Sequence, residues 1–378
     1  MNKQTKIVTV IALILIAVGM AWYGLSQKQV QPAQQASEPI KIGQITCLTG
    51  ENAWYGDIEK QGADLALEEL NAKGGINGRQ VVIVREDDKA DPALSVTGLN
   101  KLISVDKVQA VMGMTSSGGT MAASPVAEKN KVVLISSLAG SMKISNAGDY
   151  IFRIFATTAQ EAEKLLQLAK ELGKTDAAII YVNNDFGSDL ASYIKEKSVK
   201  TGVNILASES YLTDATDFRT QLAKIAATKP SVIFLLGYPK DMGLVLKQAG
   251  EMGIKSQFMA SDSFDDPTVI ATAGKASEGT IYVVSDDQTS PAFKAAFKAK
   301  YGKDSSIYNA MNYDAFNLLA LAIQRGGNDG TAIKNELYKI RDYAGTSGVI
   351  TIDSNGDAIN RSLTFKIIKD GKAVPYQQ

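Results

Sequence analysis

The chain has 378 residues, of which 45% are hydrophobic, and its 40 lysines and arginines balance its 40 aspartates and glutamates. This length suits two domains of ordinary size, and the balanced charge gives no general attraction for nucleic acid. The chain contains no histidine and a single cysteine, Cys47, which excludes Ser-His-Asp and Cys-His catalysis, an intrachain disulfide and zinc sites built from clusters of these residues. We therefore expect neither an enzyme nor a cofactor or metal site.

An apolar segment dominates the N-terminus. Nineteen uncharged residues, 7–25, follow Lys3 and Lys6. A helix of that length spans roughly 28 Å at about 1.5 Å per residue, close to the thickness of a bilayer core. Two interpretations of residues 1–25 stay open, a cleaved signal peptide and an uncleaved membrane anchor, and both export the rest of the chain. A glutamine-rich linker, residues 26–38, follows.

From residue 40 onward, short apolar runs alternate with amphipathic helical patterns. This alternation predicts parallel strands joined by right-handed helical crossovers. It starts again near Ala177, after a long helical pattern over residues 158–172, which indicates two similar α/β lobes. The predicted strands are residues 40–45, 81–84, 108–112, 132–135, 177–182, 203–210, 232–236, 257–260, 280–284, 348–352 and 363–368.

The segment around the first two predicted strands carries the most distinctive motifs. A helical pattern between Asp57 and Lys73 presents one apolar face. Gly74 and Gly75 then supply the positive φ that a helix C-terminus favours. The motifs of this segment are Leu48-Thr49-Gly50, Tyr55-Gly56, the run from Asn71 to Gly78, and Asp87-Asp88 followed by Asp91-Pro92.

With these motifs the chain resembles, from residue 40 to its C-terminus, the branched-chain amino-acid-binding family, the type I periplasmic solute-binding proteins of ABC importers. The resemblance implies two doubly wound parallel-sheet lobes joined by a hinge of three segments. It places lobe 1 at residues 39–157 and 286–346, and lobe 2 at residues 158–285 and 347–378. The three crossings are then expected near residues 156–158, 285–286 and 345–348.

The loop after Met112 is the best ligand-binding candidate from the residues themselves. Ser116, Ser117 and Thr120 offer hydroxyl groups, and two glycines allow close approach of backbone N–H groups. Ligands of doubly wound folds bind beyond the carboxyl ends of the strands, and a helix N-terminus attracts a carboxylate. An ordinary serine N-cap stays open as the alternative. A phosphate loop is disfavoured because Gly119 stands where that motif needs lysine.

The resemblance adds candidates in the next loop, residues 136–141. In the family this loop supplies a backbone carbonyl and a side-chain hydroxyl to the ligand. Leu138 falls at the carbonyl position and Gly140 at the hydroxyl position, where glycine departs from the family pattern. The missing hydroxyl is then expected from Ser141, after a shift of one residue, or its role falls to Ser117 alone.

The second predicted lobe contributes a carboxylate and aromatic rings. Asp262 falls where family members that bind amino acids often place a carboxylate against the ligand's ammonium group. A helix N-cap is the alternative for Asp262, because Pro267 follows at a distance that suits a first helical turn. The aromatic residues expected to line the cleft, or alternatively to pack the lobes, are Trp54, Tyr55, Phe186, Tyr238 and Tyr308.

The acidic run of residues 353–357 is similar to a calcium loop, but it lacks the required glycine and glutamate, since Ala358 and Thr364 occupy those positions. We expect instead a hairpin turn between strands 349–352 and 363–368.

The sequence thus predicts a solute-binding protein, in the periplasm or on the outer face of the cytoplasmic membrane. It would capture a branched-chain or other hydrophobic amino acid between two closing lobes and deliver it to an ABC permease with its ATPase subunits. A ligand such as a small amide, an aromatic acid or another organic acid stays open, as does a sensor for a membrane signalling partner. The N-terminal segment would attach the protein to the membrane if uncleaved. Nucleic acid is not expected, because the N-terminus is apolar rather than a basic helix-turn-helix.

Overall fold

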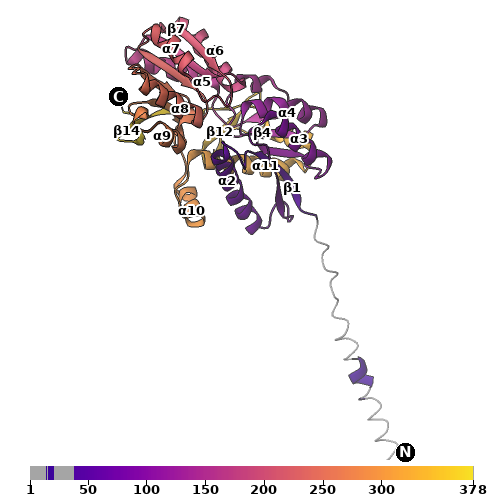
Figure 1. Cartoon of the computed structure of the whole chain (residues 1–378). Coiled ribbons are helices and arrows are strands. Elements are labelled where there is room, and N and C mark those ends of the chain that lie inside the picture. The colour runs from indigo at the N-terminus through magenta and orange to yellow at the C-terminus, as the bar shows by residue number, and fades with distance from the viewer. Residues whose placement is uncertain (1–13, 15, 21–37, 378) are drawn as a thin grey trace, which may run out of the picture. The chain divides into compact units, whose positions relative to one another are not determined.

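The computed structural model describes residues 14, 16–20 and 38–377 (Figure 1). Its compact part is the segment Pro39–Gln378, a unit separate from Met1–Glu38. Most of the predicted signal peptide or anchor, and nearly all of the linker, lie outside the described residues. Within the described ranges, no helix is both long and apolar enough to cross a membrane.

The first sheet has five parallel strands in the order β2-β1-β3-β4-β5. Alternate residues of its central strands enter two different cores, as expected of a sheet covered on both faces. Met112 and Ile135 face the core shared with α2 and α11, while Val111 and Leu134 face the core shared with α3 and α4. We call this sheet and its helices lobe 1: β1 (Ile40–Thr46), α2 (Ala53–Ala72), β2 (Val81–Asp87), α3 (Pro92–Ser104), β3 (Ala110–Gly113), α4 (Ser117–Asn130), β4 (Val133–Ser136), η1 (Met142–Asn146), β5 (Ile151–Arg153), α10 (Pro291–Tyr301), α11 (Ile307–Gly326) and α12 (Gly330–Leu337).

The second sheet has seven strands in the order β15-β14-β10-β9-β8-β6-β7. The strands from β6 to β10 are parallel, as predicted, and β14 and β15 extend the edge in antiparallel pairing. We call this sheet and its helices lobe 2: α5 (Thr158–Glu171), β6 (Asp176–Val182), α6 (Asp185–Thr201), β7 (Asn204–Tyr211), α7 (Arg219–Ala227), β8 (Val232–Leu236), α8 (Pro239–Glu251), β9 (Gln257–Ala260), η2 (Asp262–Asp265), α9 (Pro267–Ala273), η3 (Gly274–Ser277), β10 (Ile281–Ser285), β14 (Leu363–Lys369) and β15 (Lys372–Pro375).

A small antiparallel sheet holds the remaining strands, β11 (Tyr343–Gly345), β12 (Gly348–Ile352) and β13 (Ala358–Ile359). The expected hairpin between strands 349–352 and 363–368 is wrong, because the turn after Asp353 joins β12 to β13 and β14 pairs with β10 instead. The Asp353 carboxylate accepts hydrogen bonds from the backbone N–H groups of Asn355 and Asp357, at 2.8 and 3.0 Å. It is therefore a turn-capping group.

Arg153, at the end of β5, ties this small sheet to the first sheet. Its guanidinium is fully buried and pairs with Asp357 at 2.8 Å. It also donates to the backbone oxygens of Gly140 and Ser141, at 2.9 and 2.7 Å. Pairing with lobe 2 begins only at Leu363. We therefore propose residues 360–363, instead of 345–348, for the third crossing between lobes.

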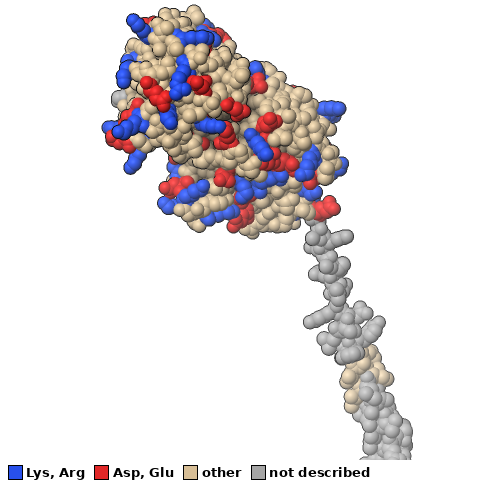
Figure 2. Space-filling view, viewed as in Figure 1, with Lys and Arg blue, Asp and Glu red and all other residues tan. Residues whose placement is uncertain are grey.

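The surface carries both signs of charge interspersed over the visible face (Figure 2). This agrees with the equal numbers of acidic and basic residues in the sequence. On this face, the charge gives no broad basic surface of the kind that nucleic-acid binding uses.

Candidate functional site

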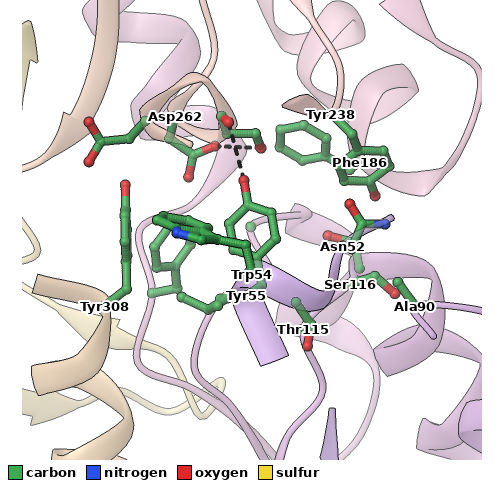
Figure 3. A pocket seen from close by; sticks show the side chains of 16 residues that line it. Asn52, Trp54, Tyr55, Ala90, Thr115, Ser116, Phe186, Tyr238, Asp262 and Tyr308 are labelled. Carbon is green, nitrogen blue, oxygen red and sulfur yellow. Dashed lines mark hydrogen bonds between the residues drawn. The ribbon is translucent and has the colours of Figure 1, made fainter. Parts of the chain in front are cut away.

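A cavity lies between the two lobes (Figure 3). Its residues come from loops that follow the carboxyl ends of strands in both sheets and from the first turn of α11, which is where doubly wound folds bind ligands. The lining residues are Asn52, Trp54, Tyr55, Ala90, Thr115, Ser116, Ser117, Leu138, Gly140, Phe155, Phe186, Tyr238, Asp262, Ser263, Asp265 and Tyr308.

Most of the residues singled out from the sequence lie in this cavity, but Thr120 and Ser141 do not. Thr120 is buried, and its hydroxyl donates to the backbone oxygen of Ser116 at 2.9 Å. The Ser141 hydroxyl accepts a hydrogen bond from the backbone N–H of Lys143 at 3.3 Å and so caps η1. Neither residue lines the cavity in this structure. Of the two expected substitutes for the hydroxyl missing at Gly140, Ser117 is the one that lies in the cavity.

Two serines at the start of α4 present hydroxyl protons to the cavity. The Ser116 Oγ accepts from the Gly119 N–H at 3.0 Å, and the Ser117 Oγ accepts from the Ser141 N–H at 3.2 Å. Since each oxygen already accepts a bond, its O–H group is available to donate to a ligand. Ser116 is thus both the N-cap of α4 and a cavity residue, so the two interpretations of this loop are compatible. The helix N-terminus adds positive potential, which suits a carboxylate.

Thr115 has the opposite character. Its hydroxyl donates to the Glu59 carboxyl at 2.7 Å, so its proton is not available to a ligand. Glu59 is fully buried on α2, where it also contacts the hydroxyls of Thr46 and Ser137. Burial raises the pKa of Glu59 to about 7, against the lowering effect of these hydroxyls.

Asp262 supplies negative charge at the other end of the cavity. Desolvation raises the pKa of Asp262 to about 6, although hydrogen bonds from Ser263 oppose the shift. The backbone N–H of Asp262 donates to the Glu161 carboxyl at 3.0 Å. Among the described residues that line the cavity there is no lysine or arginine. A ligand with a positively charged group would therefore supply the missing counter-charge.

Aromatic rings form the walls. Phe186 and Tyr238 of lobe 2 stack with their ring centroids 6.0 Å apart and an interplanar angle of 26°. Apolar walls with a few directed polar groups are typical of small-molecule sites. The other ring pairs in the lining are Trp54 with Tyr55, at 5.0 Å, and Phe155 with Tyr308, at 6.2 Å.

The lobes contact each other around the cavity, so the structure is a closed arrangement. The Tyr55 hydroxyl of lobe 1 donates to the backbone oxygen of Ser263 in lobe 2 at 3.2 Å. At the rim, Lys240 of lobe 2 pairs with Glu51 of lobe 1. A second ion pair across the lobes joins Lys143 to Asp185 at 2.7 Å.

Sequence reasoning missed several lining residues. Phe155 was missed because β5, which precedes it, has only three residues and gives no clear apolar run. Thr115 lies beside the two chosen serines, and its position after a strand was the available signal. The other lining residues not singled out are Asn52, Ala90, Ser263 and Asp265.

Known proteins resemble this chain in sequence and in fold. The model of the family described as periplasmic binding protein matches residues 39–372. The leucine-, isoleucine-, valine-, threonine- and alanine-binding protein of Pseudomonas aeruginosa is 27% identical over 370 residues, which cover 96% of each chain.

Solved structures agree with this match. The leucine-binding protein LivK of Thermotoga maritima has a TM-score of 0.84 and 27% identity, covering 89% of this chain and 98% of its own. The branched-chain amino acid transporter substrate-binding protein LivJ of Streptococcus pneumoniae, in complex with isoleucine, has a TM-score of 0.81 and 28% identity, with the same coverage. The chain has the two-lobed fold of these proteins and belongs to the periplasmic binding protein family.

Proposed function

We propose that this protein captures a free amino acid with an apolar side chain between its two lobes, outside the cytoplasm, and delivers it to an ABC permease. The binding part of the proposal follows from the cavity, and the transport part from the relatives. The relatives described above are named for binding leucine, isoleucine or valine. Export would depend on the N-terminal segment, as a cleaved signal or as an anchor.

One observation carries the proposal. A single cavity contains two serine hydroxyls with free protons at the N-terminus of α4 and, from the facing lobe, the Asp262 carboxylate with no lysine or arginine among the described lining residues. The first group suits a carboxylate and the second suits an ammonium group. An amino acid carries both charges on one carbon atom, so it satisfies both ends at once.

The aromatic walls support an apolar side chain. A hydrophobic side chain between such rings gains about 25 cal/mol for each Å² removed from water. An organic acid without an amine would leave Asp262 desolvated and unpaired, which opposes its binding. Gly140 lacks the side-chain hydroxyl that the family uses to bind the amino acid. For this reason a small amide or an aromatic acid stays an alternative ligand.

A thermal-shift panel tests the proposal. The purified protein is unfolded and refolded to remove any bound ligand, and then melted with leucine, isoleucine, valine, phenylalanine or alanine. Parallel samples contain the corresponding acids without the amino group, and the amides. A ligand at about 100 times its dissociation constant stabilises the protein by about 2.7 kcal/mol, a readily measured shift. Shifts with amino acids alone support the proposal, whereas shifts only with acids or amides contradict it.

A further inference from the structure

The Tyr308 hydroxyl is buried in the ligand cavity without a partner. Tyr308 is 3% exposed, and no described residue lies within hydrogen-bonding distance of its phenolic oxygen. The residue lines the cavity, and its oxygen points to the end of the cavity where Asp262 lies (Figure 3). A buried hydroxyl without a hydrogen bond destabilises a protein. Because the Tyr308 hydroxyl faces the cavity, a polar atom of the bound ligand would supply its missing hydrogen bond.

Other acceptors gather at the same end. The Tyr55 hydroxyl donates its proton to the backbone oxygen of Ser263, so its oxygen can accept a hydrogen bond from a ligand in the cavity. Asp265 is already satisfied, because its carboxylate accepts from Lys366 at 2.8 Å and from Tyr282 at 2.7 Å. Asp262 is therefore the lining carboxylate whose charge still needs a cation.

The phenol of Tyr308 keeps its proton at neutral pH. Burial, and then the carboxylates of Asp265 and Asp262, raise the pKa of Tyr308 well above its ordinary value. The oxygen of a neutral phenol has lone pairs that can accept a hydrogen bond from an N–H group of a ligand. A purely apolar ligand atom at this end would leave the hydroxyl unpaired.

We propose that Asp262, Tyr55 and Tyr308 form an acceptor corner that takes the three N–H groups of a primary ammonium, which makes Tyr308 a specificity-determining residue for primary amines. This assignment rests on the function proposed above and adds to it. Gly140 has no side-chain acceptor. The three acceptors of the corner therefore come from Asp262 in lobe 2, from Tyr55 at the start of α2 and from Tyr308 at the start of α11. A secondary ammonium has two N–H groups and would leave one acceptor unused.

The test compares wild-type protein, Tyr308→Phe and a matched control, Tyr211→Phe. The Tyr211 hydroxyl is also buried without a described partner, but it lies outside the cavity. Titration calorimetry measures leucine, N-methylleucine and 4-methylpentanoate, the acid that lacks the amine. We expect Tyr308→Phe to weaken leucine binding by about tenfold and to leave 4-methylpentanoate unchanged, because a hydrogen bond to a charged group contributes about that factor. Tyr211→Phe should change neither.

Wild-type protein alone gives a second measurement, independent of the folding of any variant. It should bind leucine at least about tenfold more tightly than N-methylleucine. Equal binding of the two ligands, or equal losses for leucine and 4-methylpentanoate in Tyr308→Phe, would overturn the corner while leaving amino-acid binding intact. Failure of wild-type protein to bind any amino acid would instead overturn the proposed function, and the corner with it.

Discussion

The backbone N–H of Asp262 donates to the carboxyl group of Glu161 at 3.0 Å, so two acidic residues meet at the lobe 2 side of the cavity. Glu161 is 5% exposed, and burial followed by the charge of Asp262 raises its pKa well above the ordinary value. In this pair the proton is favoured on Glu161 and the negative charge on Asp262, which lines the cavity.

Asp262→Ala should abolish amino-acid binding and spare a simple carboxylic acid. The ammonium group loses a charge-assisted hydrogen bond, and we expect leucine to bind about 100-fold more weakly or worse. Calorimetry with leucine and 4-methylpentanoate measures both effects. Equal losses for both ligands would contradict the ammonium role of Asp262.

The same carboxylate makes leucine affinity depend on pH. Because the pKa of Asp262 is about 6, its anion forms as the pH rises through that value. Leucine should therefore bind more weakly at about pH 5 than at about pH 7.5 in wild-type protein, since only the anion pairs with an ammonium group. A binding constant that does not change over this range would show that another group holds the amine.

Glu161→Gln should retain leucine binding within about twofold, because the amide oxygen still accepts from the Asp262 N–H. Because the pKa of Glu161 is raised in the folded protein, its carboxyl loses its proton at lower pH in the unfolded chain than in the folded one. The free energy of unfolding of wild-type protein therefore falls as the pH rises above the pKa of Glu161 in the unfolded chain. The variant should therefore melt higher than wild type at about pH 8 and similarly at about pH 4. Glu163→Gln, on the exposed face of the same helix, is the control and should not show this pattern.

Glu59 shares a hydroxyl donor with a second buried acceptor, the side-chain oxygen of Asn312. Asn312 donates through Nδ2 to the backbone oxygen of Tyr308 at 3.0 Å, so its Oδ1 accepts from Ser137 at 2.7 Å. Ser137 has one proton for two buried acceptors, the Asn312 Oδ1 at 2.7 Å and the Glu59 carboxyl at 3.1 Å, so it compensates the charge of an ionised Glu59 only in part. Burial therefore raises the pKa of Glu59 to about 7, although the surrounding hydroxyls lower it.

Glu59→Gln should therefore fold normally and lose a pH dependence that wild type has. Wild-type stability should fall as the pH rises from about 4.5 to about 7, on the order of 3 kcal/mol for this group, because the unfolded carboxyl ionises first. Denaturant midpoints measured across that range should show a smaller slope in the variant. Glu68→Gln, exposed on the same helix, is the control. An unchanged slope in Glu59→Gln would mean that Glu59 is ionised in the folded protein.

Gly140→Ser should fold and tighten leucine binding. A Cβ atom at Gly140 would meet the backbone oxygen of Ala156 at 3.5 Å and the Thr158 side chain at 3.6 Å, which are ordinary contacts. We expect the melting temperature to change little, and the added hydroxyl to reach the ligand's charged head. Gly330→Ser is the contrasting variant, because its Cβ would lie 1.8 Å from the Lys131 backbone oxygen and must destabilise the fold. A severe loss of stability in Gly140→Ser would contradict the available space.

The two sheets could be predicted because buried parallel strands form short apolar runs, and the runs over residues 132–135 and 232–236 are unambiguous. The elements that were missed, such as β5 and β13, are too short to show a period. In the site, position after a strand identified Ser116 and Asp262 correctly as cavity residues. It also selected Ser141, which caps η1 instead of lining the cavity, because the direction of a hydroxyl depends on the backbone of its loop.

The buried guanidinium of Arg153 sets a condition on how the protein is made. Its counter-charge, Asp357, lies 204 residues later in the chain. Until the ribosome has released that aspartate, the nascent first lobe would have to bury an uncompensated positive charge directly behind the loop that carries Gly140. We therefore expect lobe 1 to complete its core only when synthesis of the chain is almost finished. Most residues of lobe 2 are synthesised before Asp357. A protein exported unfolded meets this condition without delay, since its whole chain reaches the far side of the membrane before either lobe must be finished.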